Sequence, residues 1–596
     1  MRIHRRHLRV LTKGDIAFMG ATGTIEHRVA RLRDAFAEDG FRVSDEDVVV
    51  YCDRIGMAAS HRSAVNSVTL APKRAYYIEG NAYQLGYLMG RLAEPEISRM
   101  TESFIDRVVK AMIRTSLRGE RADITRDPEV RLIRIHRLLI DSLYEMIRRK
   151  RIRADVPSEY HREIRGIADG CLERARAESR STKVTEEELW VLNVGIDCVL
   201  SLSYTGELLR IRMPDLRGRE LQTPLGCNAF AVLNDAAADG ALFARDYMFP
   251  TGGVFQDVAC ITIYNPLGEA EKRPVPFLNL AAPGIVGSIC AINAQGVAAG
   301  VDVAVGGNCN ADRPGMNSLL LLRHAIEHGS TIEGAVDRIV SVRRGVTWNY
   351  ILAAAGSAFG PDRACVVEAG ASMRRISFLN YPRRIIRHLL PDNGFLREHR
   401  TAEDRGGAMI RWDDYAGTSA YVERFNQALW ERFQRIYDAD VFGPRGKINS
   451  EYCDHNCPHN FYFAPHRGLP GRVVLATNHF VIPEMRLCGM ARWANRVSKG
   501  RADDSQWRYD ELNDRILDIV ERQGAVTYDQ AKDLIDFLAP YGDFPDYYCR
   551  IPRGPDGRHE MIYGSVSLCD LKRKTMESHY GYYDDEWVKV CLPRYV

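Results

Sequence analysis

The chain has 596 residues, of which 45% are apolar and 27% charged, so it can bury large cores and divide into two or more domains. Its 81 basic and 78 acidic residues leave a net charge of +3, which gives no reason to expect nucleic-acid binding. The sequence has no apolar run of signal-peptide or membrane-spanning length, and its 14 scattered cysteines lack the density of a disulfide scaffold. It therefore predicts a cytoplasmic protein with reduced thiols.

The first part of the chain is expected to be an extension followed by a mainly helical segment. Residues 1–75 carry no motif that points to a chemistry, and 71–80 are typical of a strand that enters a turn. Residues 81–92 have helical spacing, and charged helical patterns continue from about 95 to 210. Thr185 with Glu188 predicts a capping box that starts an apolar helix. We expect an extension over 1–75 and a helical segment over 76–226.

A basic run lies at 147–153, where five of seven residues are arginine or lysine. One interpretation is an anion- or RNA-binding patch. The run has no interleaved aromatic residues and has acidic neighbours, so a solvated helix face is the favoured interpretation.

A Gly226-Cys227 step opens the apolar run 228–233, after a lead-in that contains proline. Glycine gives the backbone unusual freedom, so the Gly226 carbonyl can be held against the Cys227 sulfur. Attack there would move the acyl group from nitrogen to sulfur, and hydrolysis would leave Cys227 as a new N-terminus. Its α-amino group, with a typical pKa of about 7.7–8.0, could then act as the base for its own thiol. The alternative is a small buried residue in a strand core.

The part after Cys227 predicts short strands and helix pairs. Expected strands are 228–233, 241–246, 258–265, 276–282, 287–293, 297–303, 349–356, 363–369, 471–477 and 562–570. Expected helices are 316–328, 332–343, 419–437, 505–522 and 528–539, the second capped by Ser330. This order fits an α+β fold, a four-layer αββα sandwich of two antiparallel sheets covered by helices.

Two further clusters have alternative interpretations. Residues 300–308 are rich in glycine, but they lack the Gly-Lys-Ser/Thr ending of a phosphate loop, so a strand and turn beside the site is favoured. Residues 453–459, Cys-Asp-His-Asn-Cys-Pro-His, contain four zinc-type ligands. Consecutive side chains of one segment cannot easily surround one ion, so we expect no metal there.

A resemblance to a known family covers most of the chain. The carrying motifs are Cys227-Asn228-Ala229-Phe230-Ala231-Val232, the segments 81–92, 239–246, 291–300, 349–356 with 366–368, Thr477-Asn478-His479-Phe480, and 505–509. In order and spacing they resemble the N-terminal-nucleophile (Ntn) hydrolases, in particular the isopenicillin-N acyltransferase-like group, with bile salt hydrolase and penicillin V acylase as more distant relatives. The resemblance implies the αββα fold, a pro-segment ending at Gly226, and a catalytic domain over 227–596.

The resemblance also implies site residues. Cys227 would be the nucleophile and Asn349 the side-chain donor to the oxyanion. Arg245 would lie beside the thiol, unless it forms a surface ion pair with Asp246. Arg508 would lie at a helix start near the site.

Two positions depart from the family pattern. Met248 stands where an aspartate is usual; Asp246 could substitute, but from the opposite strand face. Asp302 stands where an asparagine is common, and an ionised carboxylate there would repel an oxyanion. Either Asp302 is protonated, or Asn293 or another donor serves, or the chemistry differs.

The sequence thus predicts a self-processing cysteine amidohydrolase or acyltransferase acting on a small-molecule amide. It predicts no cofactor, metal, nucleic acid or membrane partner, and leaves a homo-oligomer open. The alternatives are a phospholipase-B-like acyl ester hydrolase of the same fold and an unprocessed relative that binds a ligand without catalysis. In an uncleaved enzyme the base would come from elsewhere, with His479 as the candidate.

Overall fold

The structure is a computed structural model of the whole chain. The residues that it describes are 8–10, 24–117, 129–212, 226–249, 253–268, 274–304, 309–310, 312–356, 360–372, 402–415, 468–482, 485, 504–537, 563–582 and 585–596. No helix in these ranges is long and apolar enough to cross a membrane.

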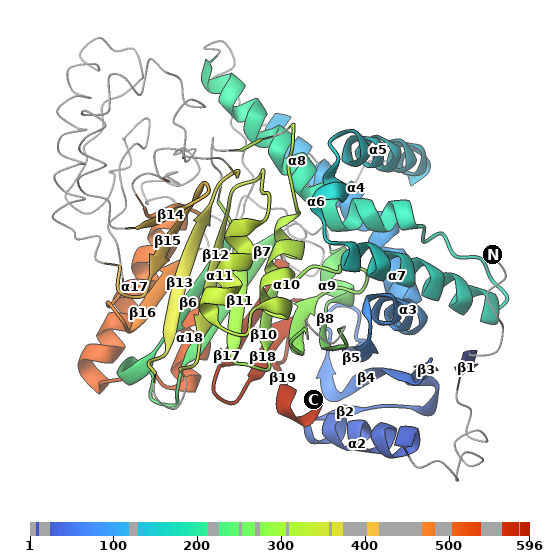
Figure 1. Cartoon of the computed structure of the whole chain (residues 1–596), viewed down its shortest axis with the longest axis horizontal. Helices are drawn as coiled ribbons and strands as arrows, with labels where there is room; N and C mark the ends of the chain where they lie inside the picture. The colour runs from blue at the N-terminus through green and yellow to red at the C-terminus, as the bar shows by residue number, and fades with distance from the viewer. Residues whose placement is uncertain are drawn as a thin grey trace.

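Two β-sheets occupy the centre of the molecule (Figure 1). The larger sheet, 13-stranded in the described ranges, consists of β1 (Leu8–Val10), β2 (Phe41–Arg42), β3 (Val48–Tyr51), β4 (Arg54–Val65), β5 (Pro72–Gly80), β8 (Cys260–Pro266), β9 (Phe277–Ala281), β10 (Cys290–Asn293), β11 (Val297–Val303), β12 (Trp348–Ala354), β13 (Arg363–Ala369), β14 (Glu403–Arg405) and β15 (Ala408–Trp412). Its order is β1-β3-β4-β5-β8-β9-β10-β11-β12-β13-β15-β14, with β2 paired to β4.

The smaller sheet carries the Gly-Cys step. Its six strands are β6 (Gly226–Val232), β7 (Leu242–Phe249), β16 (Val473–Ala476), β17 (Tyr563–Asp570), β18 (Thr575–Tyr580) and β19 (Val588–Cys591), in the order β16-β6-β7-β17-β18-β19. Strand β11 of the larger sheet packs against β6 and β7, so the two sheets lie face to face.

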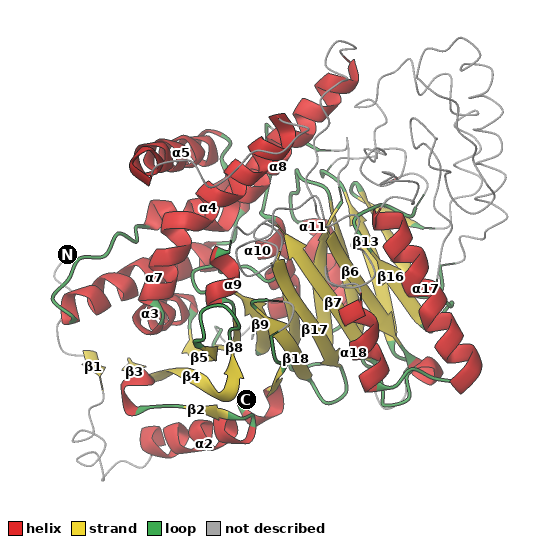
Figure 2. Cartoon of the chain, turned by 180° about the vertical axis from the view of Figure 1, so that it is seen from behind, coloured by secondary structure: helices red, strands yellow, loops and turns green. Residues whose placement is uncertain are grey.

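Helices cover both outer faces. On the larger sheet α10 (Ser318–His328) lies against β10 and β11, and α11 (Ile332–Ser341) lies against β12 and β13. Figure 2 shows α17 (Asp504–Gln523) and α18 (Tyr528–Phe537) over the smaller sheet, where they contact β6, β7 and β17. These four layers are an αββα sandwich, so the predicted fold class is confirmed.

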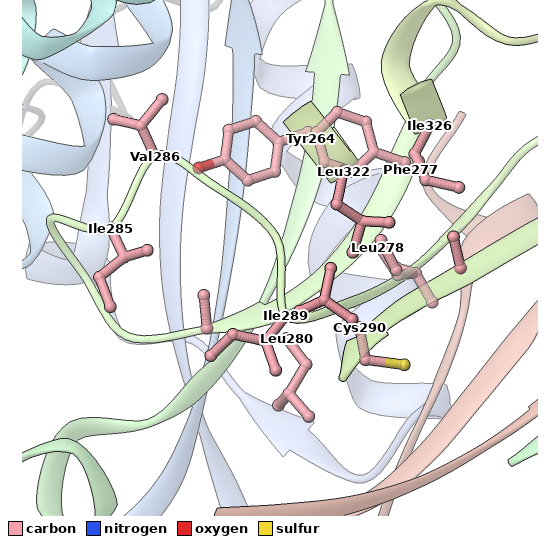
Figure 3. Close-up of a cluster of buried hydrophobic side chains, with 14 of the residues drawn as sticks. Tyr264, Phe277, Leu278, Leu280, Ile285, Val286, Ile289, Cys290, Leu322 and Ile326 are labelled. Carbon is pink, nitrogen blue, oxygen red and sulfur yellow. The ribbon is translucent and has the colours of Figure 1, made fainter. Parts of the chain in front are cut away.

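The core between the layers is apolar on matching faces. Figure 3 shows Leu322 and Ile326 of α10 near Phe277 and Leu278 of β9, all of them buried. On the other side, Phe230 and Val232 of β6 join the helices α17 and α18 in a second cluster. Strand alternation explains the division, because successive residues of β6 point to opposite faces of the sheet.

The residues before Cys227 are part of the same architecture. Their helices are α2 (Thr24–Glu38), α3 (Ala82–Leu92), α4 (Glu94–Leu117), α5 (Glu129–Arg149), α6 (Ile152–Asp155), α7 (Ser158–Ala177) and α8 (Glu186–Arg212). The expected boundary at residue 75 falls inside β5, which pairs in parallel with β8 from the part after Cys227. The described residues of the extension therefore lengthen the central sheet rather than preceding it.

Residues before α3 also contact residues near the C-terminus. The Asp39 carboxylate, after α2, accepts hydrogen bonds from the Cys591 amide at 3.0 Å and the Tyr595 hydroxyl at 2.9 Å. Lys73 of β5 pairs with Asp585, and both side chains are buried. A role for residues 24–75 in holding the fold together follows, which the sequence alone did not show.

Helices α3 and α7 approach each other backbone to backbone. A Cβ added at Gly86 would lie 2.0 Å from the Glu163 carbonyl oxygen, and one added at Gly90 would lie 2.3 Å from that of Ile167. Gly166 and Gly170 make the reciprocal contacts from α7. The glycines of the 81–92 motif are thus explained by close packing, since any side chain there would hold the helices apart.

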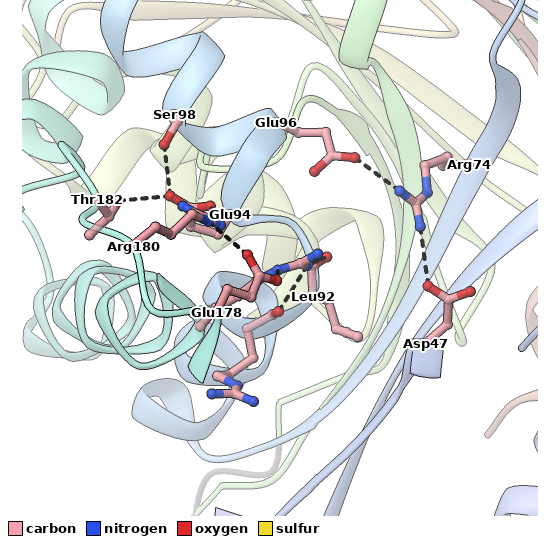
Figure 4. A network of polar contacts seen from close by, with 11 residues as sticks. Asp47, Arg74, Leu92, Glu94, Glu96, Ser98, Glu178, Arg180 and Thr182 are labelled. Atoms are coloured by element: carbon pink, nitrogen blue, oxygen red, sulfur yellow. Dashed lines mark hydrogen bonds and ion pairs between the residues drawn. The ribbon is translucent and has the colours of Figure 1, made fainter. Parts of the chain in front are cut away.

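A polar network fixes the start of α4 (Figure 4). The Glu94 carboxylate accepts hydrogen bonds from Thr182 at 2.8 Å and Ser98 at 3.0 Å, and it pairs with Arg180. These contacts join α4 to the loop between α7 and α8. Because Glu94 is buried, its partners offset the cost of removing the carboxylate from water.

The expected elements agree closely with the observed ones where the structure describes them. Strand β11 has the expected bounds, and Thr185 and Glu188 form the predicted capping box through hydrogen bonds of 3.2 and 3.0 Å. The cap of α11 is Thr331, whose hydroxyl accepts from the Gly334 amide at 3.1 Å, so the prediction of Ser330 was wrong by one residue. The expected helix 419–437 and the cluster 453–459 lie outside the described residues.

The basic run 147–153 is a solvated helix end. Arg148 and Arg149 are exposed and pair with Glu145 one turn earlier, while Ile147 and Ile152 are buried. The favoured interpretation of a solvated face is confirmed for these arginines.

Candidate active site

Cys227 is the second residue of β6 and is completely buried. It lies opposite Tyr247 in the antiparallel pairing of β6 with β7, and Ala229 lies opposite Arg245. By strand alternation the side chains of Cys227, Arg245 and Tyr247 share the face that looks toward the larger sheet. Asn228 and Asp246 share the opposite face, under helix α17.

On the inner face the Cys227 thiol lies 3.7 Å from the Met248 carbonyl oxygen, and the buried cation Arg245 interacts with it electrostatically. Its guanidinium reaches β11, where it donates to the Val301 carbonyl and lies 3.0 Å from the Asp302 carboxylate. Burial would lower the pKa of Arg245, but the neighbouring Asp302 and Cys227 outweigh burial and raise it. The guanidinium is therefore a fixed positive charge beside the sulfur, and the alternative of a surface ion pair with Asp246 is wrong.

Asp302 compensates that charge. Both of its oxygens are buried and have no hydrogen-bond donor among the described residues, although the ion pair with Arg245 is close. Burial raises the pKa of Asp302, and the positive charges of Arg245 and Arg508 partly oppose this. Arg245 passes directly over Gly300, where an added Cβ would lie 2.7 Å from its Cδ. The glycine of β11 thus leaves the room through which Arg245 reaches Asp302.

On the outer face Arg508 holds the backbone of Cys227. From the first turn of α17 it donates to the Cys227 carbonyl oxygen at 2.7 Å and to the Asn228 side chain. The Asn228 amide in turn donates to Asp246 at 2.8 Å. Arg508, which the sequence suggested could be merely solvated, is completely buried, and Asp246 lies on this face rather than beside the thiol.

Asn478 completes the surroundings of Cys227 and was not among the predicted site residues. Its side-chain oxygen accepts from the Cys227 amide nitrogen at 2.6 Å and from Arg508 at 3.0 Å. Its amide nitrogen donates to the Val303 carbonyl at 2.9 Å. The motif Thr477-Asn478-His479-Phe480 contained the signal, but only the fold shows which of its residues reaches Cys227.

Asn349 holds the loop that carries Asn478. Both hydrogens of its side-chain amide are donated to backbone carbonyls, to Thr477 at 3.0 Å and to His479 at 2.8 Å. In this arrangement they are not directed at an oxyanion beside Cys227. The observed role of Asn349 is to position the loop after β16.

Glu368 supports the same loop from the neighbouring strand. Opposite Asn349 in the β12–β13 pairing, its carboxylate accepts from the Val481 amide at 2.9 Å and from Arg411 at 3.1 Å. Burial raises the pKa of Glu368 and Arg411 opposes this. Asn349 and Glu368 thus fix a buried loop through its own backbone groups.

His479 and Asn293 make hydrogen bonds to neighbouring loop and helix groups. The His479 ring nitrogen Nδ1 lies 3.0 Å from the Thr477 hydroxyl and 2.8 Å from the Ser505 hydroxyl, so the histidine joins the loop to α17. Asn293 donates to the Ile326 and Gly329 carbonyls and accepts from two amides of its own turn. Its amide hydrogens are used at the C-terminal end of α10 and its oxygen in the β10–β11 turn, so it is not available as the alternative oxyanion donor.

Gly226 packs directly against the end of the Met248 side chain and has no unusual dihedral angle. It is not among the described glycines with positive φ, and an added Cβ would lie 1.6 Å from the Met248 methyl group. Met248 therefore fills the volume next to the Gly226-Cys227 bond. The expectation of a strained glycine backbone is not supported by this geometry.

The fold and site together define an αββα protein with a buried cysteine between a buried arginine and an asparagine. No protein-family model matches the chain. An uncharacterised protein of Archaeoglobus fulgidus is 25% identical over 519 residues, which are 86% of this chain and 65% of that protein. The chain thus spans slightly less than two thirds of the length of that relative.

Among solved structures, the chain is similar to an N-acylethanolamine-hydrolyzing acid amidase ortholog of Caenorhabditis elegans, with a TM-score of 0.27 and 9% identity over 58% of this chain and 93% of that one. It is also similar to a mutant of a conjugated bile acid hydrolase from Clostridium perfringens, with a TM-score of 0.29 and 8% identity over 61% and 93% of the two chains. A second variant of that hydrolase gives a TM-score of 0.28 and 9% identity over 62% and 93%. At these TM-scores the similarity is too weak to assign a family or a reaction.

Proposed function

We propose that the chain is a self-processing cysteine hydrolase or acyltransferase of the Ntn superfamily, in the isopenicillin-N acyltransferase-like group, with Cys227 as nucleophile. The observation that carries the proposal is that the amide nitrogen and the thiol of Cys227 each have their own polar partner. The Cys227 amide nitrogen donates a hydrogen bond to the side-chain oxygen of Asn478, and the thiol interacts with the buried cation Arg245. A structural cysteine in a strand core needs neither arrangement.

Self-processing would begin with attack of the Cys227 sulfur on the Gly226 carbonyl carbon. The carbon–nitrogen bond breaks, the nitrogen takes up a proton to become an amine, and the acyl group stays on sulfur as a thioester. Water then cleaves the thioester, which leaves a Gly226 carboxylate and a free Cys227 thiol. The new amino group would remain where the amide nitrogen is now, on the side-chain oxygen of Asn478.

Turnover would use the same atoms on an external amide. The amino group accepts the thiol proton, the sulfur attacks the substrate carbonyl, and the proton passes to the leaving amine. Arg245 stabilises the thiolate through its charge. Water, or a second amine in a transferase, then removes the acyl group. Nucleophile and base come from one residue, so the proposal needs no cofactor.

The predicted donor to the oxyanion changes role in this proposal. Because both amide hydrogens of Asn349 are held by Thr477 and His479, we assign it to positioning Asn478. Replacing Asn349 would therefore affect Cys227 through the loop that carries Asn478.

Intact-mass measurement and denaturing electrophoresis of freshly expressed protein test the proposal. We expect the wild type to give fragments 1–226 and 227–596, and Cys227→Ala to give one full-length chain. Cys365→Ala is the matched control, since Cys365 is equally buried but lies on β13. If the wild-type chain stays uncut, Cys227 has no free amino group to act as the base, and this mechanism is refuted.

One observation favours a second candidate, an unprocessed relative that binds a ligand without catalysis. Asp302 neutralises Arg245, and Met248 fills the space beside Gly226. This candidate predicts an uncut wild-type chain without amidase activity. A phospholipase-B-like ester hydrolase would instead be cut but would turn over matched esters and not amides.

A further inference from the structure

A cluster of three metal-type ligands lies away from Cys227, where α7 meets α10. Glu159 is in the first turn of α7, and His324 and His328 are one turn apart on α10. One oxygen of Glu159, Oε1, lies 2.8 Å from His328 Nε2 and 3.7 Å from His324 Nδ1. All three ligand atoms lie within 4.8 Å of one another.

These distances suit a single small cation. Neighbouring ligand atoms around a tetrahedral zinc ion, with bonds of about 2.0–2.1 Å, lie roughly 3.3 Å apart. The two distances from Glu159 Oε1 bracket that value, so rotations of the three side chains would bring the atoms onto one ion. Histidines four residues apart on a helix face the same way, which is why the pair recurs at zinc sites.

The chemical types of the three ligands indicate which class of metal the site would bind. Two imidazoles and one carboxylate suit zinc and neighbouring transition metals, whereas magnesium and calcium prefer ligand sets made of oxygen. Three protein ligands leave one position open for water. The side chains of Glu159, His324 and His328 are 31%, 13% and 17% exposed, so an ion can reach them from solvent.

The surrounding contacts fix the two helices in register. Arg323 of α10 forms two hydrogen bonds of 2.7 Å to Glu163 of α7 and one of 3.1 Å to Glu327. The Tyr160 hydroxyl donates to Glu327 at 3.2 Å. Arg323 and Glu163 are both buried, so the backbone positions of the three ligands are set before any ion arrives.

We propose that Glu159, His324 and His328 bind one zinc-like divalent cation that links α7 to α10. Helix α7 precedes Gly226 and α10 follows Cys227, so the ion would join the two parts of the chain across the Gly226-Cys227 bond. The site does not require that this bond be cleaved or that Cys227 be catalytic. It is a structural crosslink rather than a part of the thiol chemistry.

Equilibrium dialysis of full-length, chelator-treated protein against zinc, with metal analysis, tests the site. We expect one equivalent in the wild type. Since loss of a residue that merely supports a ligand costs about 10–100-fold in metal affinity, loss of a ligand in His324→Ala should cost at least about 100-fold. His328→Gln keeps a hydrogen-bond donor for Glu159 without the imidazole, so loss of binding in this variant cannot be ascribed to the loss of that hydrogen bond.

Two control variants exclude other zinc ligands. His27→Ala removes an exposed histidine of α2, and Cys453→Ala/Cys457→Ala removes the thiols of the 453–459 cluster. Both should keep the single equivalent, and the wild type loaded with cobalt should show visible tetrahedral bands without thiolate charge-transfer absorption. Absence of stoichiometric binding, binding that survives in His324→Ala and His328→Gln, or loss of binding in the double cysteine variant would each overturn the proposal.

Discussion

Replacing Gly90 with alanine tests the backbone contact between α3 and α7. The new Cβ would lie 2.3 Å from the Ile167 carbonyl oxygen and 2.8 Å from the Cys171 amide nitrogen. A relaxed carbon–oxygen contact is about 3.3–3.6 Å, so the helices must move apart locally by roughly 1 Å. Backbone atoms cannot rotate away as the end of a side chain can.

The sign of the stability change is the informative quantity. In an open helix the change from glycine to alanine stabilises by about 1 kcal/mol, because alanine has the higher helix propensity. Overpacking a closed interface costs about 1–3 kcal/mol, and here it opposes that gain. Subtracting the gain leaves an expected net loss of up to about 2 kcal/mol for Gly90→Ala.

Thermal unfolding of Gly90→Ala beside Gly334→Ala provides the measurement. Gly334 is also helical, on α11, but a Cβ there meets nothing closer than the Thr331 hydroxyl at 3.4 Å. The melting temperature should fall for Gly90→Ala and stay level or rise for Gly334→Ala. Equal melting temperatures for the two variants, at or above the wild type, would refute the close approach of the helices.

Two further predictions concern Asn478 at the candidate active site and Asp197 on helix α8. Asn478→Ala removes the acceptor of the Cys227 nitrogen, and since hydrogen bonds between neutral groups contribute about 0.5–1.5 kcal/mol, self-cleavage should slow by about 2–13-fold in timed electrophoresis; an unchanged rate would contradict the role of Asn478. Asp197 is buried on α8, and burial raises its pKa to about 7, although Ser318 donates to it. Its unfolded carboxyl has a pKa of about 3.9, so the wild type loses stability between about pH 4 and 7, up to about 4 kcal/mol, and the loss then stays constant. Asp197→Asn keeps an acceptor for the Ser318 amide without the charge, so its advantage over the wild type in urea unfolding should grow from pH 4 to pH 7, and a gap independent of pH would count against a raised pKa.

The local patterns of the sequence located most elements of the sandwich. Short runs rich in valine and alanine, with turn signals beside them, placed β11 and β13 at their observed bounds, because these strands are buried on both faces and bracketed by glycine or proline. They did not indicate that 41–80 belongs to the same sheet, since β5 and β8 pair across about 180 residues and nothing local specifies a parallel partner.

For the same reason, the sequence predicted only part of the candidate active site. Strand alternation predicted that Asp246 would act from the opposite face of the strand, and in the structure it lies with Asn228 on the face away from the Cys227 side chain. It could not show that the amide of Asn349 is used by the loop at 477–479, or that Asn478 reaches the Cys227 nitrogen, because both contacts join segments more than 100 residues apart. Asn293 illustrates the converse, since an asparagine in a suitable motif proved to be needed by its own turn.

The sequence by itself determined the bounds of many strands and helices after Cys227, that Cys227 begins a strand after a glycine, and which residue types could serve a thiol. These are properties of short stretches, where propensity, alternation and capping act within a few residues. The tertiary structure alone decided that Arg245 pairs with Asp302, that Arg508 is buried against the backbone of Cys227, and that Glu159 meets two histidines. Each of these contacts depends on the stacking of sheets and helices, in which the burial of apolar faces brings distant polar groups together.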